Sequence, residues 1–141
     1  MNESIHLVDV NVVIARIFES HEHHQLAVEW FNTPGLKWAL CPWSEAGFLR
    51  YATRENRISM REATGILEDL AQHPGYHYHG IAHDWRTLTK TFLHRLHGHK
   101  QITDALLLGL ALQDDLILVT FDRAILHMAG NSGKVQFVEQ M

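Results

Sequence analysis

Short apolar runs of strand length alternate with stretches of helical periodicity along this chain, and this alternation limits the fold more than any other feature. Strands that alternate with helices are typical of a parallel sheet with helices on its faces. The expected strands span residues 5–10, 37–41, 76–81, 116–120 and 135–138. The expected helices span residues 11–19, 22–32, 42–51, 59–72, 85–95, 101–113 and 122–128. We therefore predict an α/β fold built on a parallel sheet.

Local signals mark several of these boundaries. Pro42 suits the first position of a helix, because its missing N–H would be unpaired there in any case. Ser59 followed by Glu62 matches a capping box, and Asp84 can cap the helix that begins at Trp85. These signals predict where helices begin more firmly than where they end.

The composition favours one soluble domain over residues 1–141. Hydrophobic residues make up 46% of the chain and charged residues 20%, and no segment is apolar enough to span a membrane. The only cysteine, Cys41, lies in an apolar run, so we expect it to be buried and no internal disulfide to form. We expect a cytoplasmic protein. The formal net charge of −4 means that any contact with nucleic acid needs a local basic face or a bound cation.

Four carboxylates fall at strand ends or in the first turns of expected helices. These residues are Asp9, Glu45, Asp104 and Asp122. Each has a local alternative explanation, since Asp9 and Asp122 could cap helices and an acid in a first turn is favoured by the helix dipole. In an open parallel sheet, however, the carboxyl ends of the strands share one edge, where ligands bind. The four acids could therefore line one cleft.

Carboxylates gathered in one cleft repel each other, and a divalent cation relieves that repulsion. Mg²⁺ and Mn²⁺ prefer oxygen ligands. The reaction suited to such a site is hydrolysis of a phosphodiester bond, with the cation assisting both the attacking and the leaving oxygen.

The sequence around these acids resembles that of the PIN-domain ribonucleases, and most closely that of the VapC-type toxins of VapBC toxin–antitoxin pairs. The matching blocks cover nearly the whole chain. They are Leu7-Val8-Asp9-Val10-Asn11, Trp43-Ser44-Glu45-Ala46-Gly47-Phe48-Leu49-Arg50, Ile102-Thr103-Asp104-Ala105 and Val119-Thr120-Phe121-Asp122.

The resemblance implies a three-layer α/β/α sandwich with a short parallel sheet, which is PIN-like and Rossmann-like. It implies an endoribonuclease dependent on Mg²⁺ or Mn²⁺, a homodimer, and neutralisation by a VapB-type antitoxin whose tail occupies the cleft. Asp9 and Asp104 would be the main metal ligands, and Glu45 and Asp122 would complete the acidic set. Asn11 and Thr120 would support them through hydrogen bonds.

Four arginines recur at helical spacing after Glu45. They are Arg50, Arg54, Arg57 and Arg61. Because Ser59 is expected to begin a new helix, the stripe could be split between two helices. It could be a rim that contacts RNA phosphates, with Arg50 and Arg54 nearest the acids, or a solvated face.

Histidine and tryptophan clusters have two possible explanations each. His21, His23 and His24 could bind a transition metal, but their spacing matches no standard zinc pattern, which favours a solvated helix start. The histidines near Lys100 could contact phosphate or only line a loop; they are His94, His97 and His99. The tryptophans could stack on bases, but their apolar contexts favour the core or a dimer interface. They are Trp30, Trp38, Trp43 and Trp85.

Other classes of protein fit the pattern less well. A haloacid-dehalogenase phosphatase needs a second acid at the position of Asn11, and a response-regulator receiver domain needs paired early acids and a late lysine. A non-catalytic binding module on the same fold has no need of the complete acidic set. A PIN-domain nuclease that processes RNA without acting as a toxin would have the same site, so the residues leave that alternative open.

Overall fold

A computed structural model describes residues 4–92, 98, 101–130 and 133–138. In this part of the chain five strands form one parallel sheet in the order β3-β2-β1-β4-β5. The strands are β1 (His6–Val8), β2 (Trp38–Leu40), β3 (Tyr76–Tyr78), β4 (Ile117–Thr120) and β5 (Val135–Phe137). The predicted parallel sheet and all of its expected strands are confirmed.

The strand order reverses between β1 and β4, which lie side by side with Leu7 opposite Leu118. Connections leave such a pair toward opposite sides of the sheet, so a crevice opens beyond the carboxyl ends of the two strands. Asp9 directly follows β1, and Asp122 lies just beyond the end of β4. The topology therefore places two of the four expected acids at the point where an open sheet of this type binds ligands.

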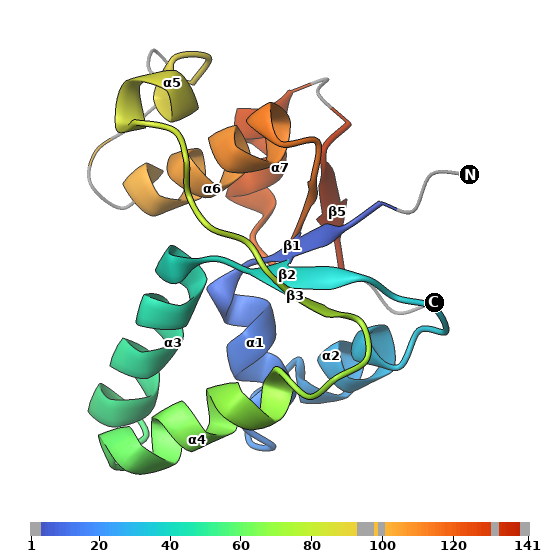
Figure 1. Ribbon diagram of the computed structural model, residues 1–141, viewed down its shortest axis with the longest axis vertical. Helices are drawn as coiled ribbons and strands as arrows, with labels where there is room; N and C mark the ends of the chain where they lie inside the picture. Colours follow the sequence, from blue (N-terminus) through green and yellow to red (C-terminus); the bar gives the residue numbers. More distant parts are fainter. Residues whose placement is uncertain (1–3, 93–97, 99–100, 131–132, 139–141) are drawn as a thin grey trace.

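Helices cover both faces of the sheet, so the molecule has three layers (Figure 1). Helices α1 to α4 lie on one side and α5 to α7 on the other. The described helices are α1 (Val10–Ile17), α2 (His24–Phe31), α3 (Pro42–Arg54), α4 (Met60–Leu70), α5 (Trp85–Thr89), α6 (Ile102–Gln113) and α7 (Arg123–Ala129). The predicted α/β/α sandwich is confirmed.

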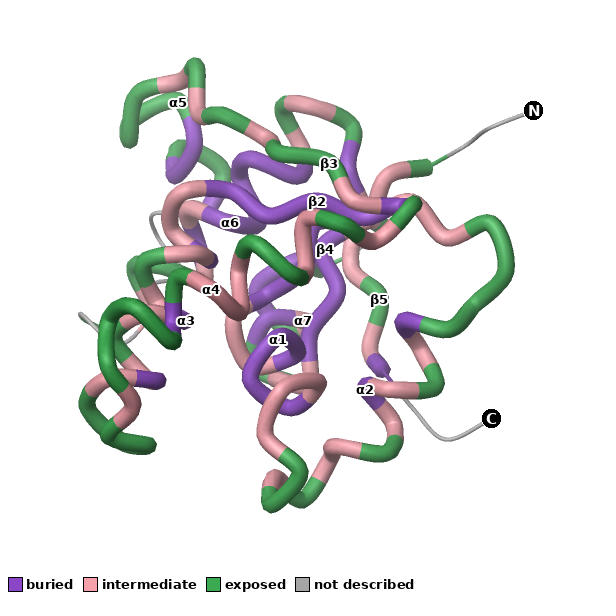
Figure 2. Tube along the Cα trace, turned by 60° about the horizontal axis from the view of Figure 1, so that its bottom comes forward, coloured by how far each residue is buried: buried purple, intermediate pink, exposed green. Residues whose placement is uncertain are grey.

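Two hydrophobic clusters fill the spaces between the layers. Successive strand residues point to opposite faces of a sheet, so Leu7 packs in the cluster with α6 and α7 while Val8 packs in the cluster with α1 and α3. Leu118 and Val119 of β4 divide in the same way. Figure 2 shows buried residues concentrated on β2, β4 and α1, and exposed residues on the linkers and the outer turns of the helices.

The predicted element boundaries are right to within three residues, except at the end of α5. The strand expected over 76–81 ends at Tyr78, because its neighbour β2 ends at Leu40 and Pro42 already starts α3. The helix expected over 85–95 ends at Thr89, where a turn follows, and residues 93–97 lie outside the described chain. The cap at Ser59 is confirmed, since its Oγ accepts from the Glu62 amide at 3.1 Å, whereas the reciprocal bond to Glu62 Oε1, at 3.2 Å, comes from the Ser59 hydroxyl instead of its backbone amide.

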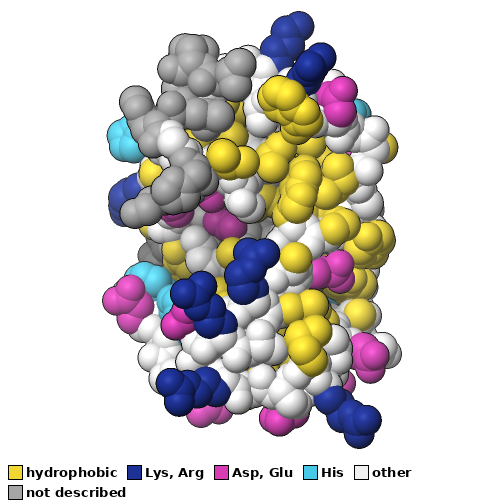
Figure 3. Space-filling view, turned by 90° about the vertical axis from the view of Figure 1, so that its left-hand side faces the viewer, with side chains coloured by type: hydrophobic (Ala, Val, Ile, Leu, Met, Phe, Trp, Pro, Cys, Tyr) yellow, Lys and Arg dark blue, Asp and Glu magenta, His cyan; other side chains and the backbone are white. Residues whose placement is uncertain are grey.

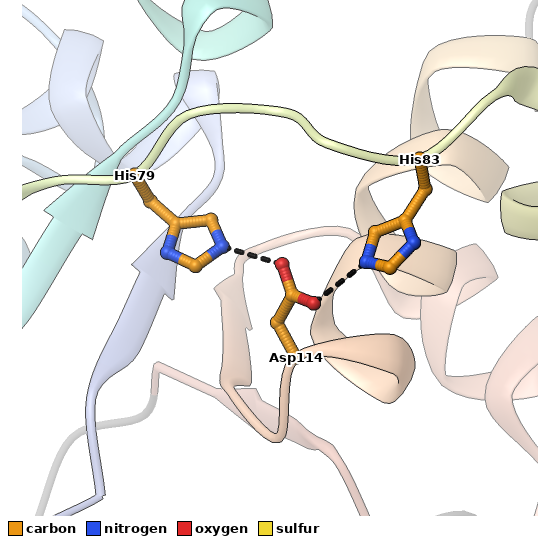
Figure 4. A network of polar contacts seen from close by, with 3 residues as sticks. All are labelled: His79, His83 and Asp114. Atoms are coloured by element: carbon orange, nitrogen blue, oxygen red, sulfur yellow. Dashed lines mark hydrogen bonds and ion pairs between the residues drawn. The ribbon is translucent and has the colours of Figure 1, made fainter.

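A polar clasp joins the linker between β3 and α5 to the end of α6 (Figure 4). His79 Nε2 donates to one carboxylate oxygen of Asp114 at 2.7 Å, and His83 Nε2 donates to the other at 2.8 Å. Asp114 follows the last residue of α6. Because one carboxylate holds both imidazoles, residues 79–83 are fixed to the layer that carries α6.

In the described part of the chain, no helix has the length and apolar character needed to cross a membrane.

Candidate active site

A recess of about 430 Å³ lies at the carboxyl end of β1, between α1, α3 and the start of α6. Asp9 and Asp104 line it together with Arg50 and Arg54 of α3. Figure 3 looks onto the side of the molecule that carries α3, where Lys or Arg side chains stand beside recessed acidic ones. Acids and cations therefore share one concave surface.

Asp9 is held rigidly although its carboxylate is buried. It is 4% exposed and serves as the N-cap of α1, with Oδ1 accepting from the Val10 amide at 2.7 Å. Its Oδ2 accepts from the Thr120 hydroxyl of β4 at 2.8 Å. The capping explanation offered by the sequence is thus correct, but it accounts for only one of the two carboxylate oxygens. The second joins Asp9 to the neighbouring strand.

Asp9 and Asp104, the two aspartates that line the recess, both have raised pKa values. Burial, reinforced by the charge of Asp122, raises the pKa of Asp9 to about 6, against the hydrogen bonds from Thr120 and Val10. Partial burial together with the charges of Asp9 and Asp122 raises the pKa of Asp104 to about 7. Asp104 lies in the first turn of α6, as expected. The fold therefore keeps mutually repelling carboxylates close together, an arrangement that costs stability unless a cation is bound.

Thr120 is the centre of the polar network beneath these acids. Besides donating to Asp9, its Oγ1 accepts from the Asp122 amide at 2.9 Å and from Asn11 Nδ2 at 3.4 Å. Asn11 Oδ1 in turn accepts from the Phe121 amide at 3.3 Å. The residues expected to support the acids, Asn11 and Thr120, thus connect α1 to the end of β4. The network leaves Asp122 as the N-cap of α7, with Oδ1 accepting from the Ala124 amide.

Glu45 is the expected acid that the structure does not bring to the other three. It lies in the first turn of α3 but is absent from the lining of the recess. Burial raises the pKa of Glu45, and its charge acts on Tyr76 of β3, whose pKa it helps burial to raise. The Ser44 hydroxyl donates to the Val8 carbonyl at 3.0 Å, which fixes the rotation of α3 about its axis. With Ser44 directed toward β1, the next residue, Glu45, projects from a different face of the helix.

The side-chain atoms at the recess that could bind a metal ion are all oxygens, which suits Mg²⁺ or Mn²⁺ better than a softer metal. Asp9 and Asp104 fit such a cation chemically, since both are buried or half-buried and both carry a raised pKa that a positive charge would lower. Within the described residues, no three His, Cys, Asp or Glu side chains stand close enough as placed to surround one ion.

Only part of the arginine stripe reaches the recess. Arg50 and Arg54 line it, whereas Arg61 lies on α4, which begins at Met60. The expected split of the stripe between two helices is therefore confirmed. Arg57 lies between these helices with a φ of 55°.

Trp43, Gly47 and Tyr51 also line the recess, although none of them was expected there. These residues lie on the same helix face as Arg50 and Arg54. The signal that could have found them was their helical spacing.

The remaining expectations divide in three ways. Cys41 is fully buried, as expected. Trp38 is fully buried, as core packing requires, whereas Trp85 is 60% exposed, and for Trp85 the dimer interface stays a prediction. The expected histidine contacts near Lys100 involve His94, His97 and His99, which lie outside the described residues.

Comparisons with known proteins agree with this geometry. The family model of the PIN domain matches residues 6–131. Ribonuclease VapC38 of Mycobacterium tuberculosis is 36% identical over 128 residues, which cover 87% of this chain and 89% of the relative. Ribonuclease VapC44 of the same species is 32% identical over 127 residues, covering 84% and 87%.

A solved structure shares the fold at low sequence identity. It is that of VapBC2 from Rickettsia felis bound to a DNA fragment from their promoter, with a TM-score of 0.68 and 10% identity. The match covers 96% of this chain and 99% of the solved chain.

Proposed function

This chain belongs to the PIN-domain family, among its VapC-type ribonucleases, and from that premise we propose that it is a divalent-metal-dependent endoribonuclease that acts as the toxin of a toxin–antitoxin pair. The observation that carries the proposal is the gathering of Asp9, Asp104 and Asp122 at the switch point of the sheet, where burial and the neighbouring charges raise the pKa of Asp9 and that of Asp104. The proposed substrate is the phosphodiester backbone of RNA.

In the proposed site Asp9 and Asp104 hold Mg²⁺ or Mn²⁺, and Asp122 adds negative charge beside them. A bound cation supplies the Lewis acidity that phosphodiester hydrolysis needs at neutral pH. Thr120 and Val10 keep the Asp9 carboxylate in one orientation through its two oxygens. Because these partners are already in place, little reorganisation is needed when the substrate arrives.

Arg50 and Arg54 are proposed to contact RNA phosphates on the α3 wall of the recess. They would balance the acids locally in a protein whose net charge is −4. Glu45 stays in the proposed catalytic set as its fourth acid, since it lies in the block that matches the family, although its charge acts on Tyr76 and it does not line the recess in this structure.

The proposed partners are a second copy of this chain and a VapB-type antitoxin. Support for the antitoxin comes from the curated relatives, which are VapC ribonucleases, and from the solved neighbour, which is a VapBC pair. A short neighbouring reading frame for a DNA-binding protein would be the simplest independent support.

The test of the nuclease is cleavage of mixed RNA by purified protein with Mn²⁺. Asp9→Asn and Asp104→Asn should each lower the cleavage rate on the order of 100-fold or more. Asp69→Asn is the matched control, because Asp69 is an exposed acid of α4 away from the recess. Equal cleavage by wild type and both site variants would show that the activity is a contaminant and that the proposed site is wrong. Glu45→Gln, measured beside them, decides whether the site extends to Glu45.

The toxin role needs a separate test, because a PIN-domain nuclease that processes RNA would pass the first one. Inducible expression of wild type and Asp9→Asn, with growth and total RNA followed together, distinguishes the two. Growth arrest with discrete RNA fragments for wild type alone supports the toxin, whereas cleavage without arrest supports the processing nuclease.

A further inference from the structure

The three histidines at the start of α2 have different surroundings. Two of them, His21 and His24, form side-chain hydrogen bonds with the backbone, and His23 does not. His24 Nδ1 donates to the Ala15 carbonyl at 2.8 Å, which ties the start of α2 to α1. His21 Nδ1 accepts from the His23 amide at 3.0 Å, which closes the turn before α2. His23 is the N-cap residue of α2, yet its side chain makes no capping hydrogen bond.

The His23 side chain instead stacks on Phe121. The two ring centroids lie 4.7 Å apart, and the ring planes are 22° from parallel. The His23 ring also contacts that of His21, with the centroids 5.7 Å apart, and its Nε2 lies 3.5 Å from Glu22 Oε1, an exposed pair that contributes little to stability. The His23 side chain is 40% exposed, so the stack lies at the surface rather than in the core.

Phe121 connects this stack to the acids. It stands between Thr120, which donates to Asp9, and Asp122, whose charge acts on Asp9 and Asp104. Its amide is fixed by Asn11 Oδ1. The aromatic pair is therefore joined to the end of β4 directly before Asp122, outside the lining of the recess, to which α3 contributes Arg50 and Arg54. Figure 3 shows histidine side chains on the same face as these acidic and basic groups.

This arrangement matches what single-stranded RNA requires of a protein surface. Cations contact the phosphates, and aromatic rings, histidine included, stack on unpaired bases. Stacking tolerates different bases because every base offers a flat face. A surface stack one residue from Asp122 would hold a base close to the phosphate that the acids act on.

We propose that His23, stacked on Phe121, is a positioning residue that holds a nucleobase of the RNA next to the bond that is cut. The inference rests on the proposed ribonuclease function and deepens it. The sequence singled out His23 only as part of a histidine cluster, because Phe121 is far from it in the chain.

The test uses one RNA that the wild type cleaves and a series of copies in which each base near the cut is replaced in turn by an abasic residue. With wild type, kcat/KM should fall about 5- to 100-fold at one or two positions beside the cut, as expected for the loss of one stacked base. His23→Ala should cleave the intact RNA more slowly by a similar factor and should not respond to abasic replacement at those positions. His23→Phe should restore both the rate and the response.

His127→Ala is the control, since His127 is an exposed histidine of α7. An abasic profile for His23→Ala that equals the wild-type profile overturns the inference, whether its overall rate is unchanged or uniformly reduced, because a structural role would lower all rates alike. A wild type that cleaves no RNA overturns the nuclease proposal itself, so the two failures can be told apart.

Discussion

At the scale of single residues, the acidic site is a source of instability that the fold tolerates. Asp9 is almost fully buried, and its pKa is raised to about 6 although two hydrogen bonds oppose that shift. Asp104 has a pKa of about 7 for similar reasons. Buried charges of one sign are retained where function requires them, and their removal often stabilises a protein.

The pH dependence of stability should reveal this cost. The pKa of Asp104 is higher in the folded than in the unfolded protein, so its contribution is fully present below about pH 4 and is lost as the pH rises to about 7. Without metal, the melting temperature of Asp104→Asn should therefore be close to that of wild type near pH 4 and ~3–8 °C higher than that of wild type at pH 8. Thermal melts in EDTA across this range measure the difference.

Added Mg²⁺ is the complementary measurement. Because a ligand that binds only the folded state stabilises it, Mg²⁺ should raise the melting temperature of wild type more than that of Asp104→Asn. If the difference in melting temperature between wild type and Asp104→Asn in EDTA does not change with pH, the assignment of the raised pKa to Asp104 is contradicted.

At the scale of elements, close helix contacts decide where the site residues stand. A Cβ on Gly109 of α6 would come within 1.9 Å of the Leu88 carbonyl oxygen, so α5 and α6 can approach only because this residue is glycine. A Cβ on Gly47 of α3 would meet Val10 of α1 at 3.0 Å. These contacts set the positions of α3 and α6, the helices that carry Arg50 and Asp104.

Gly109→Ala should consequently destabilise the protein by about 1–3 kcal/mol through overpacking, although alanine favours a helix. Gly65→Ala in α4 is the matched control, because nothing lies within 4 Å of the added Cβ, and it should be neutral or stabilising by up to about 1 kcal/mol. Urea unfolding of both variants checks this. Equal effects of the two changes would mean that the close approach of α5 and α6 is not maintained in solution.

The clasp of Asp114 with His79 and His83 should stabilise one local part of the structure, the linker before α5 and α5 itself. Although partial burial opposes it, hydrogen bonds from the two imidazoles lower the pKa of Asp114, so its stabilising contribution is present at neutral pH and disappears only when strong acid protonates the carboxylate. Asp114→Ala should cost about 1–3 kcal/mol, since both imidazoles lose their acceptor. Hydrogen exchange should quicken in residues 79–84 and in α5, while α3 stays protected. Faster exchange throughout the protein would contradict a local role.

At the scale of the whole molecule, an acidic protein is proposed to bind a polyanion. The formal net charge is −4, so long-range attraction does not favour RNA. Binding then depends on where the cations stand, and Arg50 and Arg54 stand at the recess. Arginines placed next to the acids of the recess would contact phosphates without making the whole surface basic.

The salt dependence of RNA binding tests this distribution of charge. Replacing Arg50 and Arg54 by Ala should weaken binding and reduce the slope of log K against log salt by about 1.4, since each phosphate contact with a single strand contributes about 0.7. The control is Arg61→Ala with Arg86→Ala, which removes the same charge from exposed positions outside the recess. Equal loss of slope in the two double variants would show that total charge matters and the α3 wall does not.

The sequence by itself determined the layers of this protein and the order of its acids. Hydrophobic periodicity and capping residues are local, so the alternation of strands and helices, the helix cap at Ser59 and the position of Asp9 after the first strand could all be predicted. Parallel strands then placed Asp9 and Asp122 at one edge of the sheet.

Only the tertiary structure decided how the helices are rotated and what meets across the sheet. Packing at Ser44 and Gly47 orients α3 so that Arg50 lines the recess while Glu45 does not. The stack of His23 on Phe121 joins segments that share no local pattern. Such contacts depend on the sum of many side-chain packings, and no short stretch of residues encodes that sum.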